Sequence, residues 1–212
     1  MATERESNRY VIYNGANDKL TPDDVGSALT CMPDCVFLQL SLPEETVRAA
    51  LLQCERKSIP VYCYTGHGAV SPINLSLNCV KLLVSDERGC EALAGVTEFK
   101  QSSLVTNCVR LAGSFRADNY IIKLKSGTTL TYNNMLHFLY TPPCEVSPCD
   151  PATAFDTFAA AAAFKLIDGG NLDQAAQFAG IIEAMTLEGP GASESCPRSG
   201  DIESFKKAHG IE

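Results

Sequence analysis

The sequence predicts a three-layer αβα fold, in which helices cover both faces of a mostly parallel, Rossmann-like sheet. Two observations predict this class. Short apolar segments alternate along the chain with stretches of helical length, which is the pattern of successive βαβ units. The run CVFLQL at residues 35–40 has almost no polar alternation, as expected of a strand that is covered on both faces. The 212 residues correspond to about one large domain. No linker-like segment divides them, so we expect a single domain over residues 1–212.

Strands are expected where short apolar or alternating runs are bounded by turn residues. These runs are residues 9–13, 35–40, 60–64, 80–84, 120–124, 128–132 and 135–140. The last two are separated by Asn133-Asn134, a turn pair that predicts an antiparallel hairpin.

Helices are expected after several capping signals. Thr21 offers a hydroxyl N-cap, with Pro22 in the first helical position and acids following it. Ser41 and Glu44 have the spacing of a capping box ahead of a helix that ends near Lys57. Gly95 stops a third helix. The predicted helices begin at residue 22 or occupy residues 44–57, 86–93, 102–112, 155–167 and 172–187, and a short one begins at residue 201.

The charge pattern excludes some classes of function. The chain has 17 basic and 25 acidic residues, a formal net charge of −8, and its basic residues are scattered. Such a protein repels phosphate backbones, so nucleic acid is not an expected partner. No run approaches the roughly 20 apolar residues that span a bilayer. The charged start has no signal-peptide pattern, so a soluble, intracellular and most simply cytoplasmic protein is expected.

The cysteines and histidines give little support for a metal site. The ten cysteines include no Cys-x-x-Cys pair. Cys144 and Cys149, in a proline-rich loop, leave a disulfide or a metal open. The three histidines are far apart, and His67 in a glycine loop could be either structural or part of a ligand site. Five cysteines in apolar segments are expected to be reduced and buried: Cys54, Cys63, Cys79, Cys90 and Cys108.

Several short sequence motifs occur in a recognisable order along the chain. Residues 13–22 read YNGANDKLTP, residues 36–47 read VFLQLSLPEETV, and residues 86–95 read DERGCEALAG. Residues 150–164 and the loop with Gly191, Ala192, Ser195 and Pro197 follow. Together these segments resemble the ribokinase-like (PfkB) family of sugar and nucleoside kinases. The resemblance covers only about the C-terminal two thirds of a family member, so it implies a ribokinase-like domain without the N-terminal lid portion.

The resemblance implies a catalytic turn at Thr153, Ala154, Phe155 and Asp156. Family members have a Gly-Ala-Gly-Asp turn here, whose backbone N–H groups stabilise the transferred phosphoryl group and whose aspartate is the general base. Asp156 therefore matches the base, and residues 153–155 match the anion hole. Both glycines are replaced, although glycine allows close approach of the backbone to a phosphate. The alternative for Asp156 is an ordinary first-turn acid that stabilises the helix dipole.

Other family positions have also changed. The asparagine and glutamate that organise metal and phosphate fall on Asp86 and Gly89, with Glu87 nearby but turned elsewhere on the helix. The sugar-contacting glutamate falls on Ser41, for which an N-cap role is preferred. The glycine of the nucleotide strand–turn falls on Lys125. The positions that the resemblance assigns to nucleotide binding are Gly127, Gly180, Gly191, Ala192 and Ser195.

The positions that the resemblance assigns to catalysis have changed, while the motifs that build the fold are retained. This combination favours a catalytically degenerate kinase. Such a chain would act as a structural or regulatory subunit of an oligomer or of a larger complex, because a truncated sheet leaves apolar surface for a protein partner or another copy. One alternative is an active phosphotransferase that uses Asp156, ATP and Mg²⁺ on a sugar or small alcohol. Another is a nucleotide-binding sensor. ATP and Mg²⁺ are expected only if the nucleotide site survives.

Overall fold

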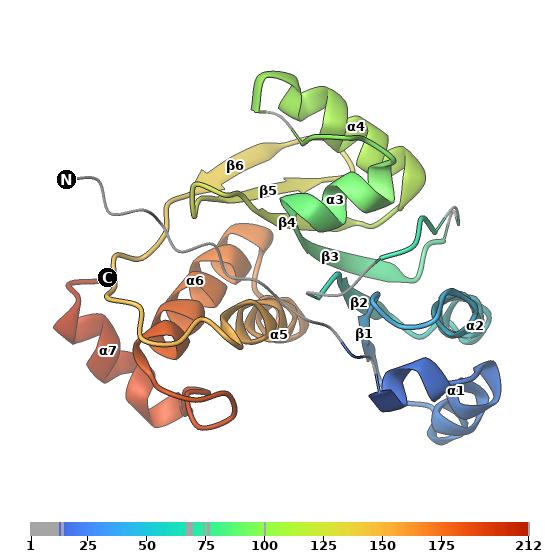
Figure 1. Ribbon diagram of the computed structural model, residues 1–212, viewed down its shortest axis with the longest axis horizontal. Coiled ribbons are helices and arrows are strands. Elements are labelled where there is room, and N and C mark those ends of the chain that lie inside the picture. Colours follow the sequence, from blue (N-terminus) through green and yellow to red (C-terminus); the bar gives the residue numbers. More distant parts are fainter. Residues whose placement is uncertain are drawn as a thin grey trace.

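Six strands form one sheet in the order β1-β2-β3-β4-β5-β6 in the computed structural model (Figure 1). The structure describes residues 13, 15–66, 70–73, 75, 77–99 and 101–211. Strands β1 to β4 are parallel, and β5 and β6 continue the sheet in antiparallel fashion. The strands are β1 (Val36–Gln39), β2 (Val61–Tyr64), β3 (Val80–Asp86), β4 (Asn119–Lys123), β5 (Thr129–Asn133) and β6 (Phe138–Thr141).

Helices cover the sheet on both faces, which gives the predicted three layers (Figure 1). Helices α1 to α4 lie on one face, α5 and α6 lie on the other, and α7 contacts α6. The helices are α1 (Pro22–Ala28), α2 (Glu44–Lys57), α3 (Glu87–Ala94), α4 (Leu104–Ser114), α5 (Ala154–Ile167), α6 (Leu172–Glu188) and α7 (Ile202–Ala208). Short 3₁₀ segments occupy Gly15–Lys19, Leu29–Cys31, Gln101–Ser103 and Ser199–Asp201.

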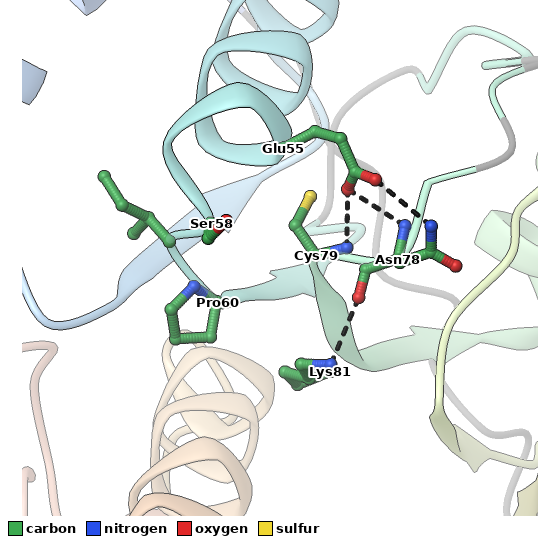
Figure 2. Close-up of a pocket in the computed structure, with 7 residues that line it drawn as sticks. Glu55, Ser58, Pro60, Asn78, Cys79 and Lys81 are labelled. Atoms are coloured by element: carbon green, nitrogen blue, oxygen red, sulfur yellow. Dashed lines mark hydrogen bonds between the residues drawn. The ribbon is translucent and has the colours of Figure 1, made fainter.

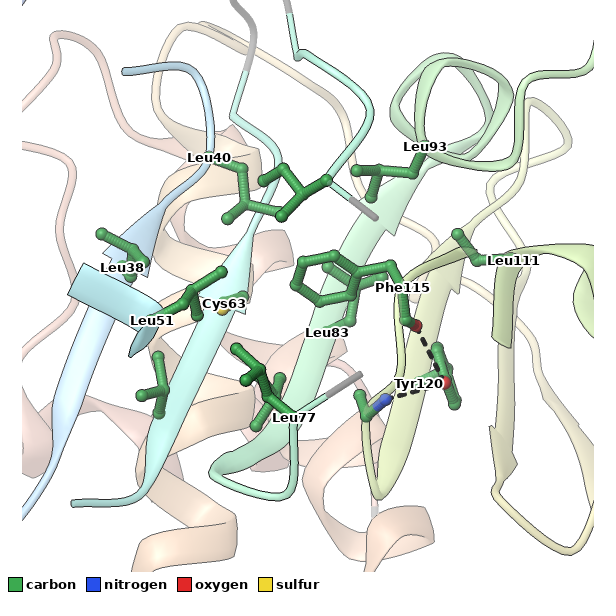
Figure 3. Close-up of a cluster of buried hydrophobic side chains, with 14 of the residues drawn as sticks. Leu38, Leu40, Leu51, Cys63, Leu77, Leu83, Leu93, Leu111, Phe115 and Tyr120 are labelled. Carbon is green, nitrogen blue, oxygen red and sulfur yellow. Dashed lines mark hydrogen bonds between the residues drawn. The ribbon is translucent and has the colours of Figure 1, made fainter. Parts of the chain in front are cut away.

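The apolar sequence of β3 is explained by its place in the middle of the sheet. Leu83 packs into the core under α2, α3 and α4 (Figure 3), while Leu82 and Val84 pack into the core under α5 and α6. All three side chains are fully buried. A strand with helices on both faces has no polar side, which explains the apolar run 82–84. The run 35–40, for which the sequence predicts cover on both faces, instead forms the edge strand β1, and Phe37 on it is 43% exposed.

Tyr120 is the largest polar side chain in the core of Figure 3, and its hydroxyl is fully paired there. It accepts a hydrogen bond from the Ala117 N–H (2.8 Å) and donates one to the Phe115 carbonyl (3.1 Å). Its ring stacks on Tyr132 with centroids 4.4 Å apart. A buried hydroxyl with both roles satisfied carries no desolvation penalty, so this residue fixes the end of α4 against β4.

The helix starts confirm one capping prediction and contradict another. Thr21 caps α1 in a capping box with Asp24, as predicted. Ser41 does not cap α2, because that helix begins at Glu44 with Pro43 as its N-cap residue. The Ser41 hydroxyl instead accepts a hydrogen bond from the Gln39 side-chain amide (2.7 Å). Ser41 is therefore too far upstream of the first turn to cap it.

The other expected elements are found with small shifts. Gly95 ends α3 in the left-handed conformation (φ 64°). The predicted last strand, 135–140, begins only at Phe138, because the Asn133 side chain accepts N–H bonds from Met135 and His137 and holds residues 134–137 in a turn. The predicted strand at residues 9–13 and His67 of the glycine loop lie outside the described residues, apart from residue 13.

The burial of the five apolar-segment cysteines is confirmed. Cys54, Cys63, Cys79, Cys90 and Cys108 are buried, and the ten cysteines, all of them in the described part of the chain, are free thiols. Cys144 and Cys149 are therefore not bonded to each other. Within the described residues, no helix has the length and apolar character needed to cross a membrane.

Candidate functional site

The candidate site lies where α5 begins, at the carboxyl ends of the parallel strands. This edge is where open α/β sheets bind ligands. Thr153 is the N-cap residue of α5, and Asp156 is the third residue of the helix. The turn has ordinary backbone geometry, with Thr153 at φ −118° and no positive φ in residues 150–156. The predicted helix start near residue 155 is confirmed, and the backbone of residues 153–156 is that of an ordinary helix start.

Phe155 shows why a phosphate cradle does not form easily here. Its side chain is buried in the core under α5, where it stacks on Phe158 with centroids 6.5 Å apart. The Ala154 N–H, one of the three matched anion-hole positions, donates to the Pro151 carbonyl (3.3 Å). The N–H of Ala152 donates to the Asp150 carboxylate (2.9 Å). The donors of Ala152 and Ala154 are thus already bonded within the protein.

Three of the five positions that the resemblance assigns to nucleotide binding lie against the turn at the start of α5. The Thr153 hydroxyl donates to the Ala192 carbonyl (3.2 Å), as does the Ser195 hydroxyl (2.9 Å), and the two hydroxyls lie 3.4 Å apart. The Gly191 N–H donates to Asp150 (3.3 Å). These bonds tie the loop after α6 to the start of α5. Asp150 connects both segments, and the Asp-Pro pair before a predicted helix was a sequence signal for it.

Asp156 lies near an aromatic residue that the sequence reasoning missed. Burial raises the pKa of Tyr64 to about 12, and the negative charge of Asp156 adds to this effect. The Tyr64 hydroxyl donates to the Gln39 side-chain oxygen (2.9 Å), and its ring stacks on Phe37. The chain of bonds continues from Gln39 to Ser41. The position matched to a sugar contact is thus engaged in an internal hydrogen-bond chain at the ends of β1 and β2.

The two positions matched to the metal- and phosphate-organising motif have structural roles in α3. Asp86 caps α3 by accepting the Gly89 N–H (2.7 Å). A Cβ at Gly89 would lie 2.5 Å from the Ser85 hydroxyl and 2.6 Å from Thr65, both of which are fully buried. No side chain larger than glycine fits at this position without rearrangement, so the family glutamate has no room.

Glu87 does not replace the lost carboxylate. It accepts the Lys125 N–H (2.9 Å) and pairs with the Lys125 ammonium (3.1 Å), so it holds the β4–β5 hairpin. Mg²⁺ prefers oxygen ligands, usually one or two carboxylates together with phosphate groups. Asp86 and Glu87 are committed elsewhere, and in the described part of the chain no three His, Cys, Asp or Glu side chains converge. Of the two positions matched to the metal-organising motif, one has lost its carboxylate to Gly89 and the other, Asp86, caps α3.

The two remaining nucleotide positions flank a buried ion pair. Lys123, at the end of β4, pairs with Glu183 of α6 (2.7 Å) and donates to the Gly127 carbonyl (3.1 Å). Gly127 has φ +85° at the hairpin, and Gly180 lies one helical turn before Glu183 with open space beside it. Burial raises the pKa of Glu183, an effect that Lys123 partly offsets. The structure therefore splits the five positions into two groups.

A separate cavity of about 340 Å³ lies at the amino ends of β2 and β3 (Figure 2). Glu55 there accepts the N–H groups of Asn78 and Cys79. The Lys81 ammonium donates to the Asn78 carbonyl and pairs with Asp118. Burial raises the pKa of the Cys79 thiol to about 12, which makes it a poor nucleophile. The charged groups that line this cavity, those of Glu55 and Lys81, are thus engaged by other groups of the protein.

The architecture is shared with solved kinases of the ribokinase fold. A ribokinase from Arabidopsis thaliana, solved with ribose and ATP, matches with a TM-score of 0.76 and 18% identity over 93% of this chain and 64% of that one. A ribokinase from Giardia lamblia matches with a TM-score of 0.77 and 15% identity over 97% of this chain and 69% of that one. These likenesses define the class of fold and confirm the predicted one.

The sequence comparisons give the family. The pattern of the pfkB family carbohydrate kinases matches residues 1–198, and this chain belongs to that family. It is 25% identical to a ribokinase of Bacillus subtilis over 92% of this chain and 64% of the relative, and 25% identical to a deoxyribokinase of Salmonella typhi over 95% and 65%. The chain thus spans just under two thirds of the length of these relatives. The family resemblance is confirmed.

Proposed function

We propose that this chain is a catalytically degenerate member of the family that serves as a structural or regulatory subunit of an oligomer or larger complex. The observation that carries the proposal is the turn at the start of α5. Phe155 is packed into the core there, and the Ala154 N–H is already bonded to Pro151. A turn without glycines and with an engaged donor is poorly suited to hold a developing negative charge.

Two further positions support the same proposal. Gly89 stands where the family has a glutamate, and Ser85 and Thr65 leave no space for one. Ser41, at the matched sugar contact, is bonded to Gln39. The metal-organising, sugar-contacting and anion-binding functions are all weakened, while the residues around them are well packed. Such a distribution fits selection for the fold without selection for phosphotransfer.

An active phosphotransferase is the second candidate, and Asp156 favours it. The carboxylate is retained in the first turn of α5, near the Tyr64 hydroxyl at the carboxyl edge of the sheet. The relatives are kinases of ribose and deoxyribose, so these sugars are the substrates to try. In this case Asp156 would accept the proton of the sugar hydroxyl.

A phosphotransfer assay with ATP, Mg²⁺ and either ribose or deoxyribose separates the two candidates. We expect no ADP release above the rate without protein, because each lost anion-hole donor costs about 10²–10³ in rate and the glutamate matched to Gly89 is missing as well. Asp156→Asn should not differ from the wild type. The matched control is Asp168→Asn, the same change just beyond the far end of α5. Activity that Asp156→Asn abolishes and Asp168→Asn preserves would overturn the proposal.

The proposed assembly involves the outer edge of β1. Among the described residues, β1 pairs only with β2, and its sequence VFLQ contains no charge that would protect an open edge. Phe37 on this strand is 43% exposed. Helix α1 packs on α2 yet contains no buried residue. An apolar edge that no described residue pairs is typical of a surface that another chain covers.

Sedimentation of the purified chain tests this surface. We expect a mass above the 22.8 kDa of one chain and a monomer for Phe37→Glu, because a charge on the edge strand opposes pairing. Leu139→Glu on β6 is the matched control, since Leu139 is 44% exposed on the opposite edge strand. A wild-type monomer, or equal effects of the two substitutions, would contradict assembly through β1.

A further inference from the structure

The ammonium of Lys123 is engaged on three sides by the protein itself. Its Nζ lies 2.7 Å from a Glu183 carboxylate oxygen and 3.1 Å from the Gly127 carbonyl oxygen. It also lies 4.8 Å from the centre of the Phe158 ring. These contacts bring together the end of β4, the β4–β5 hairpin, α6 and α5. We call this cluster of Lys123, Glu183, Gly127 and Phe158 the Lys123 cluster.

The Lys123 cluster buries two charged side chains, although apolar side chains could fill the same space. The side chains of Lys123 and Glu183 are 12% and 17% exposed. Burial disfavours the ionised carboxylate, which is the larger influence on the Glu183 pKa, and Lys123 counteracts it. A buried ion pair is seldom better for stability than well-packed apolar side chains of similar size. The presence of a cation and an anion here therefore calls for another explanation.

The position of the cluster supplies that explanation. Gly127 and Gly180 are two of the positions that the family resemblance assigns to a nucleotide. Gly127 accepts a bond from Lys123, and Gly180 precedes Glu183 by one turn of α6. The diphosphate of a nucleotide is an anion that would seek the Lys123 ammonium. Glu183 already occupies that ammonium, and its negative charge repels a second anion in partly buried surroundings.

We propose that Glu183 is an internal anion that holds Lys123 and thereby excludes phosphate-bearing ligands from the hairpin side of the family's nucleotide position. This inference deepens the proposed function, on which it rests, because it names what stands in the place of the nucleotide. It also predicts a latent anion site: neutralising Glu183 leaves a lysine with three donors and a neutral partner. The class of ligand that such a lysine takes is a nucleoside diphosphate or another diphosphate.

Calorimetric titration with ADP and with pyrophosphate tests the proposal on the full chain. Glu183→Gln keeps the size and the hydrogen-bond acceptor of the side chain and removes its charge. We expect it to bind both probes about tenfold or more tightly than the wild type does, since one repelling charge is lost and one ammonium is released. Glu188→Gln on the same helix is the matched control, because it removes an acidic charge that pairs with His209 and is about one third exposed. It should bind like the wild type.

The double variant Lys123→Met/Glu183→Gln should lose the gain. A gain that persists without Lys123, a gain for ADP but not for pyrophosphate, or equal binding by wild type and Glu183→Gln would each overturn the proposal. Glu183→Ala provides the same test if circular dichroism shows that Glu183→Gln does not fold. The readout is binding alone, so equal binding by wild type and Glu183→Gln would overturn this inference while leaving the proposed loss of phosphotransfer untouched.

Discussion

Lys123→Met is expected to lower the free energy of unfolding by about 3–5 kcal/mol near neutral pH, the range found when one partner of a buried ion pair is removed. The substitution keeps the apolar stem of the side chain over Phe158 but leaves the Glu183 carboxylate without its cation. That carboxylate is mostly buried, and burial already raises its pKa in the presence of Lys123. Urea unfolding followed by circular dichroism measures the change.

The loss should depend on pH with a definite sign. Because the pKa of Glu183 is raised in the folded protein, the folded state binds this proton more tightly than the unfolded state does. Its contribution to stability is therefore fully present below the ordinary glutamate pKa and is lost as pH rises through the folded value. Without Lys123 the folded value rises further. Lys123→Met should thus cost much less near pH 4, about the ordinary glutamate pKa, than near pH 8.

Two controls separate the buried charge from the general effect of losing a lysine. Lys81→Met removes a lysine whose ion pair with Asp118 is about two-fifths exposed on both sides, so it should cost about 0–1 kcal/mol. Lys123→Met/Glu183→Gln should recover most of the stability, because no charge remains buried. The expectation fails if Lys123→Met costs no more than Lys81→Met, or if its cost is the same at both pH values.

Local sequence signals predicted most of the fold. Thr21 with Pro22 and Asp24, the left-handed Gly95, and the Asn133-Asn134 turn before the last strand each act within a few neighbouring residues. Such signals can be interpreted without knowing the tertiary structure. Ser41 shows their limit, since the spacing to Glu44 suits a capping box but Pro43 takes the N-cap position.

The site was predictable only where the family resemblance supplied positions. Lys123 and Glu183 are 60 residues apart, and Gln39 and Tyr64 are 25 apart. No local pattern indicates that either pair meets, because the contacts arise from strand order and from the packing of α6 on the sheet. The resemblance did place Thr153 and the loop with Ala192 in one site, and their hydroxyl and carbonyl are bonded in the structure. It could not show that Phe155 faces the core.

Gly89→Ala is expected to lower the free energy of unfolding by about 1–3 kcal/mol, the usual cost of overfilling a packed core. The added methyl group would lie 2.5 Å from the Ser85 hydroxyl and 2.6 Å from Thr65, so these two fully buried side chains must shift to admit it. Ordinary helix propensity predicts the opposite sign, since alanine is favoured over glycine by about 1 kcal/mol in a helix interior. Urea unfolding therefore decides between packing and propensity.

Gly180→Ala is the matched control, because Gly180 lies in the interior of α6 with nothing within 4 Å of the added methyl. It should raise stability by about 0.5–1 kcal/mol. Gly89→Glu, which puts the family glutamate back, should be more damaging than Gly89→Ala because its Cβ meets the same contacts with Thr65 and Ser85 and carries a larger, charged side chain. If Gly89→Glu folds as well as the wild type, the site can still take that carboxylate, and the case for a lost activity weakens. If Gly89→Glu does not fold, the packing of the core itself prevents the return of the glutamate, since regaining it would require replacing Thr65 and Ser85 as well.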